Sequence, residues 1–558
     1  MFFYRFKVCC LLSCLSTYVL LSGCYSHQKQ ADVILTHGNF YTVDSNNSVV
    51  DAIAITDGRI LAIGDSSLVF HFKGNRTQII DVKGRFGCPG FNDAHIHLRQ
   101  GVRSDHEVDF SGVTSTRDIQ RLVLKTVRKL TPGAWLVGWG WDQTQMTDGR
   151  WPNRKILDAV APSVPMFIMR TCGHVALVNQ KALNIAGIHD GTPNPVGGEI
   201  ERDARGKATG ILKEEAIQLV RQYIPVEETD DLKNNLSSLF KQLCEYGITS
   251  IQDLSDPQAV NIYEELLQQD HLPCHIYEWL PLRDDLEQAK AIRHNKKSSP
   301  IRYGLLKGYI DGSLGPHTAA LYEPYQNDPQ NRGLLTQDPG ALKRQVVQAD
   351  AAGFQLGIHA IGDLANHLVL DAYELAIKVN NNRDRRHRIE HAQVLIPEDL
   401  NRFKKLNVVA SMQPVKCVMD LKWVEKSIGR QRSQYAYAWR SLLESGAVLA
   451  FGSDWPFAPL NPFVGLYAAV TRRDTTGYPP RGWIPKERLS IEDAIRAYTL
   501  GSAYAEFQDR QKGSLEIGKH ADIIILDHNL LTASPEEILK TQVIATFFNG
   551  SLVYQNNF

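Results

Sequence analysis

The sequence predicts an α/β protein built on a (β/α)8 TIM-type barrel, with a small composite β-sandwich domain made from both chain ends. In the middle of the chain, short apolar stretches alternate with amphipathic helical stretches such as DLKNNLSSLFKQLCEYG, a pattern typical of a parallel sheet. Seven apolar stretches, from GITSIQDLS to VLAFGSDWP, each run into a His, Lys, Asp or Gln. The stretch GRFGCPGFNDAHIHL supplies the eighth strand that such a barrel needs for closure.

The two ends of the chain differ from the middle, because short β-branched strands there are separated by Gly, Asn and Asp turns. We therefore expect them to pair in one domain beside the barrel. The segment at about 100–240 is too long for a loop and is expected to be an insertion over the barrel mouth. The expected division is a β-sandwich part at 24–88, the barrel with its insertion at 89–505, and a second β-sandwich part at 506–558.

The N-terminus has the features of an export signal. Arg5 and Lys7 precede the apolar run VCCLLSCLSTYVLL, which is short for a membrane span. The run ends in the motif LSGC, which resembles the lipobox of bacterial lipoproteins. Residues 1–23 are thus predicted to be a signal peptide, with Cys24 lipidated and the exported protein anchored in the cell-envelope membrane. An uncleaved anchor or a plain signal peptide is the alternative.

The charge balance and the cysteine spacing argue against several kinds of binding partner and site. The 61 basic and 61 acidic residues give a net charge of zero, and the one dense basic run, RDRRHR, is better explained as a solvated loop, so no nucleic-acid partner is expected. The five cysteines beyond the lipobox are scattered without C-x-x-C spacing, which argues against a disulfide framework and against a thiolate zinc site. A homodimer is left open.

His95 and His97 stand one residue apart at the end of the first barrel strand. Side chains two residues apart in a strand point the same way, so the two imidazoles can share a metal ion. Two histidines do not complete a four-ligand shell, and without further ligands the pair would simply be half-buried polar residues. The other predicted strand ends supply candidates: Lys307 on the fourth strand, His359 on the fifth, His391 on the sixth and Asp454 on the eighth. A barrel brings all these strand ends around one cavity.

Several stretches, in order, resemble the amidohydrolase superfamily, and within it the YtcJ-like family 3 that includes N-substituted formamide deformylases. They are GCPGFNDAHIHL, GHVALVN, KGYIDGSLG, GIHAIGD, RIEHAQ, SMQP, FGSDWPFAPLNP and GSLEIGKHADIIILD, and the resemblance covers roughly 31–555. One departure is visible: where relatives often read S-x-Q-P-x-H, this chain has Lys416 at the histidine position.

The resemblance implies a metal centre with zinc or a similar divalent ion, one or two per chain. Its ligands would be His95, His97, His359, His391 and Asp454, together with Lys307. Lys307 would bridge two ions as a carboxylated lysine, since an ordinary ammonium would be repelled by them; a substrate-binding or structural lysine is the alternative. Asp454 would also accept a proton from metal-bound water.

The resemblance also suggests residues around the metal. His174, in TCGHVALVN, would orient or polarise the substrate carbonyl, although a structural role is as well supported. Glu214, Asp311 and Asp363 would hold ligand histidines in place. Lys416 would favour an acidic substrate group if it faces inward. The insertion is rich in tryptophan, with Trp135, Trp139, Trp141 and Trp151. Of these, Trp141 is expected to contact an apolar part of the substrate. The alternative is that these tryptophans pack in a hydrophobic core.

Together these features predict a metal-dependent hydrolase that cleaves a non-peptide C–N bond of a small-molecule amide, formamide or cyclic amide with metal-activated hydroxide. An ester or lactone hydrolase is the alternative within enzymes, because the same hydroxide attacks either carbonyl. A non-catalytic envelope lipoprotein that uses the scaffold for binding is the alternative outside them.

Overall fold

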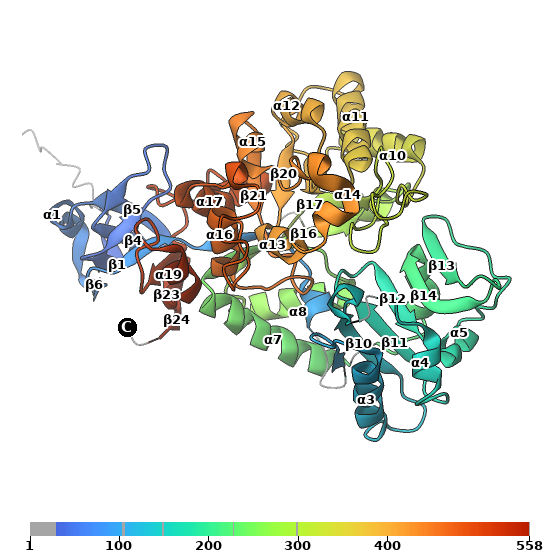
Figure 1. The fold of residues 1–558 in the computed structure, drawn as a ribbon. Coiled ribbons are helices and arrows are strands. Elements are labelled where there is room, and N and C mark those ends of the chain that lie inside the picture. The colour runs from blue at the N-terminus through green and yellow to red at the C-terminus, as the bar shows by residue number, and fades with distance from the viewer. Residues whose placement is uncertain (1–28, 103–106, 148–149, 227, 297–299, 557–558) are drawn as a thin grey trace, which may run out of the picture.

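Eight parallel strands form the central barrel of the computed structural model, which describes residues 29–102, 107–147, 150–226, 228–296 and 300–556 (Figure 1). The strands follow one another around a single sheet in chain order. They are β8 (Phe91–Ile96), β15 (Ile248–Asp253), β16 (His275–Pro281), β17 (Arg302–Tyr309), β18 (Gln355–Ala360), β19 (Arg388–His391), β20 (Val409–Met412) and β21 (Val448–Phe451). The predicted TIM-type barrel is confirmed, with all eight strands at the expected stretches.

The first and last strands meet just beyond the end of β21. There the backbone N–H of Asp454 donates to the carbonyl of His95 at 2.7 Å, and the N–H of His97 donates to the carbonyl of Trp455 at 2.9 Å. Gly452 permits this close approach, since a Cβ at that position would lie 2.5 Å from the backbone nitrogen of His95. The seam of the barrel is therefore made by the residues that carry the candidate ligands.

Helices cover the outside of the barrel, and their ends follow ordinary capping rules. In α8 the side chain of Asp256 accepts from the N–H of Ala259, and Pro257 occupies the first turn. The barrel helices are α7 (Thr229–Glu245), α8 (Pro257–Gln268), α9 (Glu287–Asn295), α10 (Pro339–Ala351), α11 (Asp363–Val379), α12 (Pro397–Lys405), α13 (Pro414–Asp420), α14 (Val424–Ser433), α15 (Trp439–Glu444), α16 (Pro462–Thr471), α17 (Ile491–Arg496) and α18 (Ser502–Ala505). No helix of the described residues has the length and apolar character needed to span a membrane.

Strands from both ends of the chain share the small β domain. A six-stranded sheet has the order β24-β23-β22-β7-β2-β3, so β22 from the C-terminal part pairs antiparallel with β7 from the N-terminal part. A four-stranded N-terminal sheet, β5-β4-β1-β6, packs on it through a shared apolar core. The bounds are β1 (Ala31–Thr36), β2 (Asn39–Tyr41), β3 (Val49–Val50), β4 (Ala52–Thr56), β5 (Arg59–Gly64), β6 (Lys73–Asp81), β7 (Phe86–Pro89), β22 (Ile523–Leu526), β23 (Val543–Phe548) and β24 (Ser551–Gln555), with α1 (Ser66–Val69) and α19 (Pro535–Lys540) beside them.

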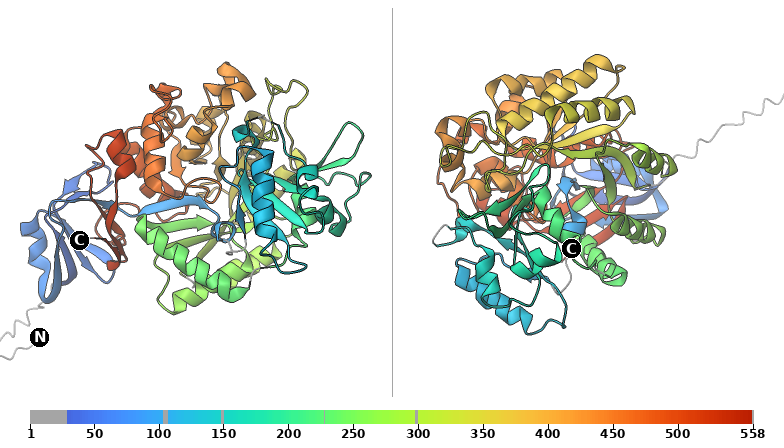
Figure 2. Two further views of the ribbon diagram at one scale, coloured as in Figure 1. Left: turned by 60° about the horizontal axis from the view of Figure 1, so that its bottom comes forward. Right: turned by 90° about the vertical axis from the view of Figure 1, so that its right-hand side faces the viewer.

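The insertion forms a six-stranded sheet of its own, at the end of the molecule opposite the small β domain (Figures 1 and 2). Apolar cores lie on both faces of this sheet. Its elements are β9 (Val108–Asp109), β10 (Leu136–Trp141), β11 (Met166–Arg170), β12 (Val175–Val178), β13 (Gly198–Arg202) and β14 (Ala208–Glu214), with α3 (Thr116–Val127), α4 (Arg154–Asp158), α5 (Gln180–Ile185) and α6 (Gln218–Arg221). The inserted sheet ends with β14, before the expected limit near 240. The next long helix, α7, already packs against β15 and so belongs to the barrel.

Candidate metal centre

His95, His97 and Asp454 bring three metal-ligand atoms together at the barrel mouth. His95 Nε2 lies 3.3 Å from His97 Nε2, and Asp454 Oδ1 lies 3.3 Å from His97 Nε2 and 3.7 Å from His95 Nε2. Ligands about 2.1 Å from a tetrahedral ion are about 3.4 Å apart, so the spacing and chemistry of this set fit a zinc-like ion.

A buried ion pair fixes the orientation of the His95 ring. His95 Nδ1 is 2.7 Å from Glu390 Oε2, and Glu390 is paired in turn with Arg388 at 2.8 Å, all three side chains being fully buried. The carboxylate accepts the Nδ1 proton, which leaves the lone pair of His95 Nε2 directed at the cluster. Burial, reinforced by Lys307, lowers the pKa of His95 to about 4, so the ring is neutral, as a metal ligand must be.

Two further histidines continue the cluster. The ring of His391 lies 5.0 Å from that of His95 and 4.5 Å from that of His359. His391 Nδ1 is 2.7 Å from Gln413 Oε1, which leaves Nε2 as the nitrogen available to a metal ion, and His359 Nε2 is 3.0 Å from the carbonyl of Gly312. Burial lowers the pKa of both imidazoles well below the ordinary value, so both are neutral at physiological pH.

Lys307 lies at the inner edge of the cluster, with Nζ 3.3 Å from His95 Nε2. Its Nζ is also 5.4 Å from the centre of the ring of Trp279, a fully buried residue whose ring lies 5.1 Å from that of His95. Burial lowers the pKa of Lys307 to about 8, which increases the fraction of neutral amine. The neutral amine is the form that can be a ligand or react with carbon dioxide.

The backbone at two strand ends is held in the left-handed region. Asp454 has φ 58° and His391 has φ 75°, values that non-glycine residues seldom adopt. At the first of these positions Asp93 ties the strands together, because its Oδ1 accepts from the backbone N–H groups of His95 and Ser453 at 3.1 and 2.9 Å. These contacts hold the candidate ligands before any ion binds.

The insertion contributes His174, whose ring lies 5.1 Å from that of His359. His174 Nδ1 is 2.7 Å from Glu214 Oε2, and the other carboxylate oxygen accepts from the hydroxyl of Thr318 at 2.6 Å. Glu214 has φ 50° and ψ −126°, a strained backbone that these contacts stabilise. Burial opposes protonation of His174, but the Glu214 carboxylate outweighs it and raises the pKa to about 9.

Lys416 faces inward from α13. Its Nζ is 3.2 Å from Asp454 Oδ2 and donates to the carbonyl of Phe457 at 2.9 Å. The two oxygens of Asp454 are thus divided, with Oδ1 toward the histidine pair and Oδ2 toward the ammonium. Burial alone would raise the pKa of Asp454, but Lys416 and the histidines hold it well below the ordinary value.

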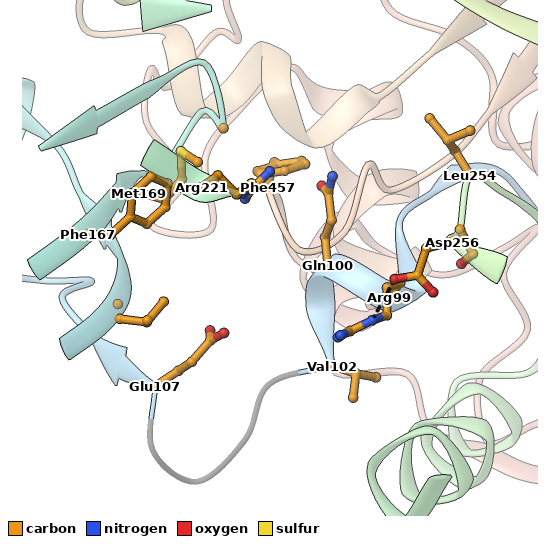
Figure 3. Close-up of a pocket in the computed structure, with 14 residues that line it drawn as sticks. Arg99, Gln100, Val102, Glu107, Phe167, Met169, Arg221, Leu254, Asp256 and Phe457 are labelled. Atoms are coloured by element: carbon orange, nitrogen blue, oxygen red, sulfur yellow. Dashed lines mark hydrogen bonds and ion pairs between the residues drawn. The ribbon is translucent and has the colours of Figure 1, made fainter. Parts of the chain in front are cut away.

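A cavity of about 420 Å³ opens onto the cluster, and its lining includes His174, His391, Lys416 and Asp454. A second cavity of about 460 Å³ is drawn in Figure 3, and Phe457 lines both cavities. There Phe167 and Met169 of the inserted sheet face Arg99 and Gln100 of the barrel across the opening. The mouth is therefore bounded jointly by the barrel and the insertion.

Comparison with known proteins gives the family. Residues 78–554 match the profile described as the amidohydrolase family. The chain belongs to this family. Among its relatives, the protein LONG AFTER FAR-RED 3 of Arabidopsis thaliana is 35% identical over 94% of this chain and 92% of the relative, and the N-substituted formamide deformylase of Arthrobacter pascens is 28% identical over 94% and 99%.

A solved structure supports the same grouping. The crystal structure of an uncharacterized metal-dependent hydrolase from Pyrococcus furiosus matches with a TM-score of 0.69 and 31% identity, over 90% of this chain and 100% of that one. The protein is thus a hydrolase of the amidohydrolase superfamily, whose barrel mouth carries the His-His-Asp set described above.

The amidohydrolase brings most of the expected site residues together, with informative exceptions. Trp141 is fully buried, donates its indole N–H to the carbonyl of Ile168 at 2.9 Å and lies in the core of the insertion, outside the described cavity lining, so the expected substrate contact is replaced by a packing role. Asp311 accepts from the N–H groups of Ile361 and Gly362 and so fixes the loop after His359. Cys24 lies outside the described residues.

Two further predicted positioning residues have different outcomes. Glu214 does hold a histidine, His174, rather than one of the ligand set. Asp363 accepts from the N–H of Tyr322 at 2.9 Å and thus braces a loop.

Sequence reasoning missed Glu390 and Gln413, which orient His95 and His391. A signal for Glu390 was present, because Arg388 and Glu390 place two charges on one face of an apolar barrel strand and such charges need buried partners.

Proposed function

We propose that this amidohydrolase cleaves a non-peptide C–N bond in a small-molecule amide, formamide or cyclic amide. The observation that carries the proposal is the spacing of His95, His97 and Asp454, which fits a tetrahedral ion, next to a cavity that Asp454 and His174 line and that is large enough for a small substrate. The similarity to a formamide deformylase over nearly the whole chain favours this bond class.

A divalent ion held by these residues would lower the pKa of a water molecule toward neutrality and polarise the substrate carbonyl. Asp454 accepts the proton of the attacking water and passes it to the leaving nitrogen, so that the products are a carboxylic acid and an amine. His174, positioned by Glu214 through Nδ1, presents its other N–H to the cavity, where it donates a hydrogen bond to the carbonyl oxygen and stabilises the negative charge that develops there.

The number of ions depends on Lys307. Its Nζ lies 3.3 Å from His95 Nε2, the same distance as His97 Nε2, and its lowered pKa favours the neutral amine. We infer that Lys307 is carboxylated when two ions are bound, because a carbamate is the anionic bridge that a lysine can provide. His359 and His391 would then hold the second ion.

Two other functions compete with this one. An ester or lactone hydrolase would use the same groups, because the same hydroxide attacks either carbonyl. Its leaving oxygen would need less proton transfer from Asp454 than a leaving nitrogen does. A non-catalytic binding protein would keep the cavity without turnover. For the C–N hydrolase and for both alternatives we propose the same location, a bacterial envelope lipoprotein anchored through Cys24.

Metal analysis of the purified protein, combined with a substrate screen, tests the proposal. The screen contains N-formyl and N-acyl amines, hydantoins, simple esters and lactones. We expect a bound divalent metal and amine release from a member of the amide group. Hydrolysis restricted to esters and lactones would favour the second function, and metal-loaded protein that hydrolyses none of these compounds would favour the binding protein.

A further inference from the structure

The ammonium group of Lys416 is available to a ligand in the catalytic cavity. Lysine has three N–H donors, and two are used here, by the carbonyl of Phe457 at 2.9 Å and by Asp454 Oδ2 at 3.2 Å. The side chain lines the cavity and is 18% exposed. Its Nζ also lies 5.7 Å from the centre of the Phe457 ring, but among the described residues no third hydrogen-bond acceptor is found for it, so one donor remains for a ligand in the cavity.

The acidic groups nearby have other partners. The Asp420 carboxylate accepts from the hydroxyl of Tyr437 and from Gln393 at 3.0 Å, and Asp142 is paired with Arg170 at 2.7 Å. Asp454 is shared with the histidine cluster through Oδ1. An ion bound by that cluster would draw the charge of Asp454 toward itself and leave the charge of Lys416 less neutralised.

We propose that Lys416 binds a carboxylate of the substrate, so that the preferred substrates are acidic amides whose carboxylate lies within a few bonds of the scissile carbonyl. This inference rests on the proposed function. The short reach follows from the geometry, because a single carboxylate group, Asp454, separates the ammonium from the histidine cluster. An N-acyl or N-formyl α-amino acid has this arrangement.

The apolar residues that line the cavity beside Lys416 indicate what kind of side chain the bound amino acid would carry. Val415, Val418 and Met419, all on α13, line the cavity together with Trp423 and Val464. These side chains form an apolar wall beside Lys416, which suits an aliphatic group attached near the carboxylate. N-formyl-L-leucine is therefore a suitable probe.

The test compares two ligand pairs that differ only in the carboxylate. N-formyl-L-leucine and N-(3-methylbutyl)formamide are compared by kcat/KM. N-methylsulfonyl-L-leucine and N-(3-methylbutyl)methanesulfonamide, which are not hydrolysed, are compared by titration calorimetry. Lys416→Met should weaken binding of the acidic sulfonamide, and kcat/KM for the acidic formamide, about 10- to 100-fold, the effect of losing one charge-assisted hydrogen bond. Binding of the neutral sulfonamide should change little, and kcat/KM for the neutral formamide, which Lys416 affects only through the pKa of Asp454, should fall less than kcat/KM for the acidic formamide.

Lys422→Met is the matched control, because Lys422 is an exposed lysine that lines the same cavity. It should leave unchanged the ratio of kcat/KM between the two formamides and the ratio of affinities between the two sulfonamides. Lys416→Arg, which keeps the positive charge, should retain the preference for the acidic ligand, with folding checked by thermal unfolding. Equal losses for acidic and neutral ligands in Lys416→Met, or no loss for either, would overturn the proposal. Hydrolysis of neither formamide would count against the proposed function alone, since the sulfonamide binding ratio decides the assignment of Lys416 by itself.

Discussion

Replacement of Glu214 by Gln tests how the insertion contributes to catalysis. The carboxylate lies 2.7 Å from His174 Nδ1 and is the main group that stabilises the imidazolium against burial. Glutamine keeps the size of the side chain and can still accept the Nδ1 proton, but the charge is lost. The variant therefore separates the charge of Glu214 from its role in holding the ring.

The structure gives the size of the effect. The pKa of His174 is raised from 6.5 to about 9 in the presence of Glu214, whereas burial alone acts to lower it. In the variant the pKa should fall below 6.5, a change of at least about 2.5 units or about 3 kcal/mol between the two protonation states. At pH 8 the wild-type ring is mostly protonated and the variant ring mostly neutral. A group that acts when protonated loses its effect as pH rises through its pKa, so the basic limb of the activity should move from near 9 to below 6.5.

The assay is kcat/KM as a function of pH for any amide that the wild type hydrolyses, because kcat/KM reports the pKa values of the free enzyme. We expect kcat/KM of Glu214→Gln to be reduced about tenfold or more at pH 8, with the deficit shrinking as the pH falls toward 6. Glu215→Gln is the control, because this neighbouring glutamate is exposed and the charge change is the same. A variant whose basic limb stays near pH 9 would refute the reasoning, and an equal loss at every pH would reduce Glu214 to a purely steric role.

Four other outcomes follow from the site and the N-terminus. Asp454→Asn should keep much of the metal, measured by mass spectrometry, and lose about 10²-fold or more in kcat, the contribution of general acid–base catalysis; a wild-type rate with metal bound would move proton transfer to another group. Glu390→Gln should weaken metal binding about 10- to 100-fold in a chelator competition, because His95 loses its charged acceptor. Growth with abundant metal and bicarbonate should raise the metal content of the wild type toward two per chain, and Lys307→Ala should prevent this; full metal content in the variant would exclude the bridge. Cys24→Ser should move the protein from the membrane to the soluble fraction, and unchanged fractionation would favour a transmembrane anchor.

The barrel and the strand-end positions of the candidate ligands were predictable from sequence because each depends on local pattern. An apolar run that stops at a polar residue identifies both a strand and its functional end, and this holds for β8 with His95 and for β18 with His359. The partners of those histidines were not predictable in the same way. Glu390 is 295 residues from His95, and only the closed barrel brings the two together.

The insertion was less predictable from sequence than the barrel. Its tryptophans indicated either a substrate wall or a core, and Trp141 proved to be core because its face of β10 packs on helices of the insertion. The link from His174 through Glu214 to Thr318 joins the insertion to a barrel loop, and it requires a backbone conformation at Glu214 that a glutamate rarely adopts. Hydrophobic periodicity predicts neither how the insertion contacts the barrel nor the rare φ value of Glu214.

The pairing of β7 with β22 has a consequence for how this enzyme is made. β7 runs through Pro89 and Gly90 directly into β8, the strand that carries the histidine pair, and its neighbour β22 is translated after the entire barrel. During synthesis, the strand that leads into the first candidate ligands therefore has one edge unpaired until more than 400 later residues have emerged. The candidate metal centre is then fully supported only after strands from both ends of the protein have paired.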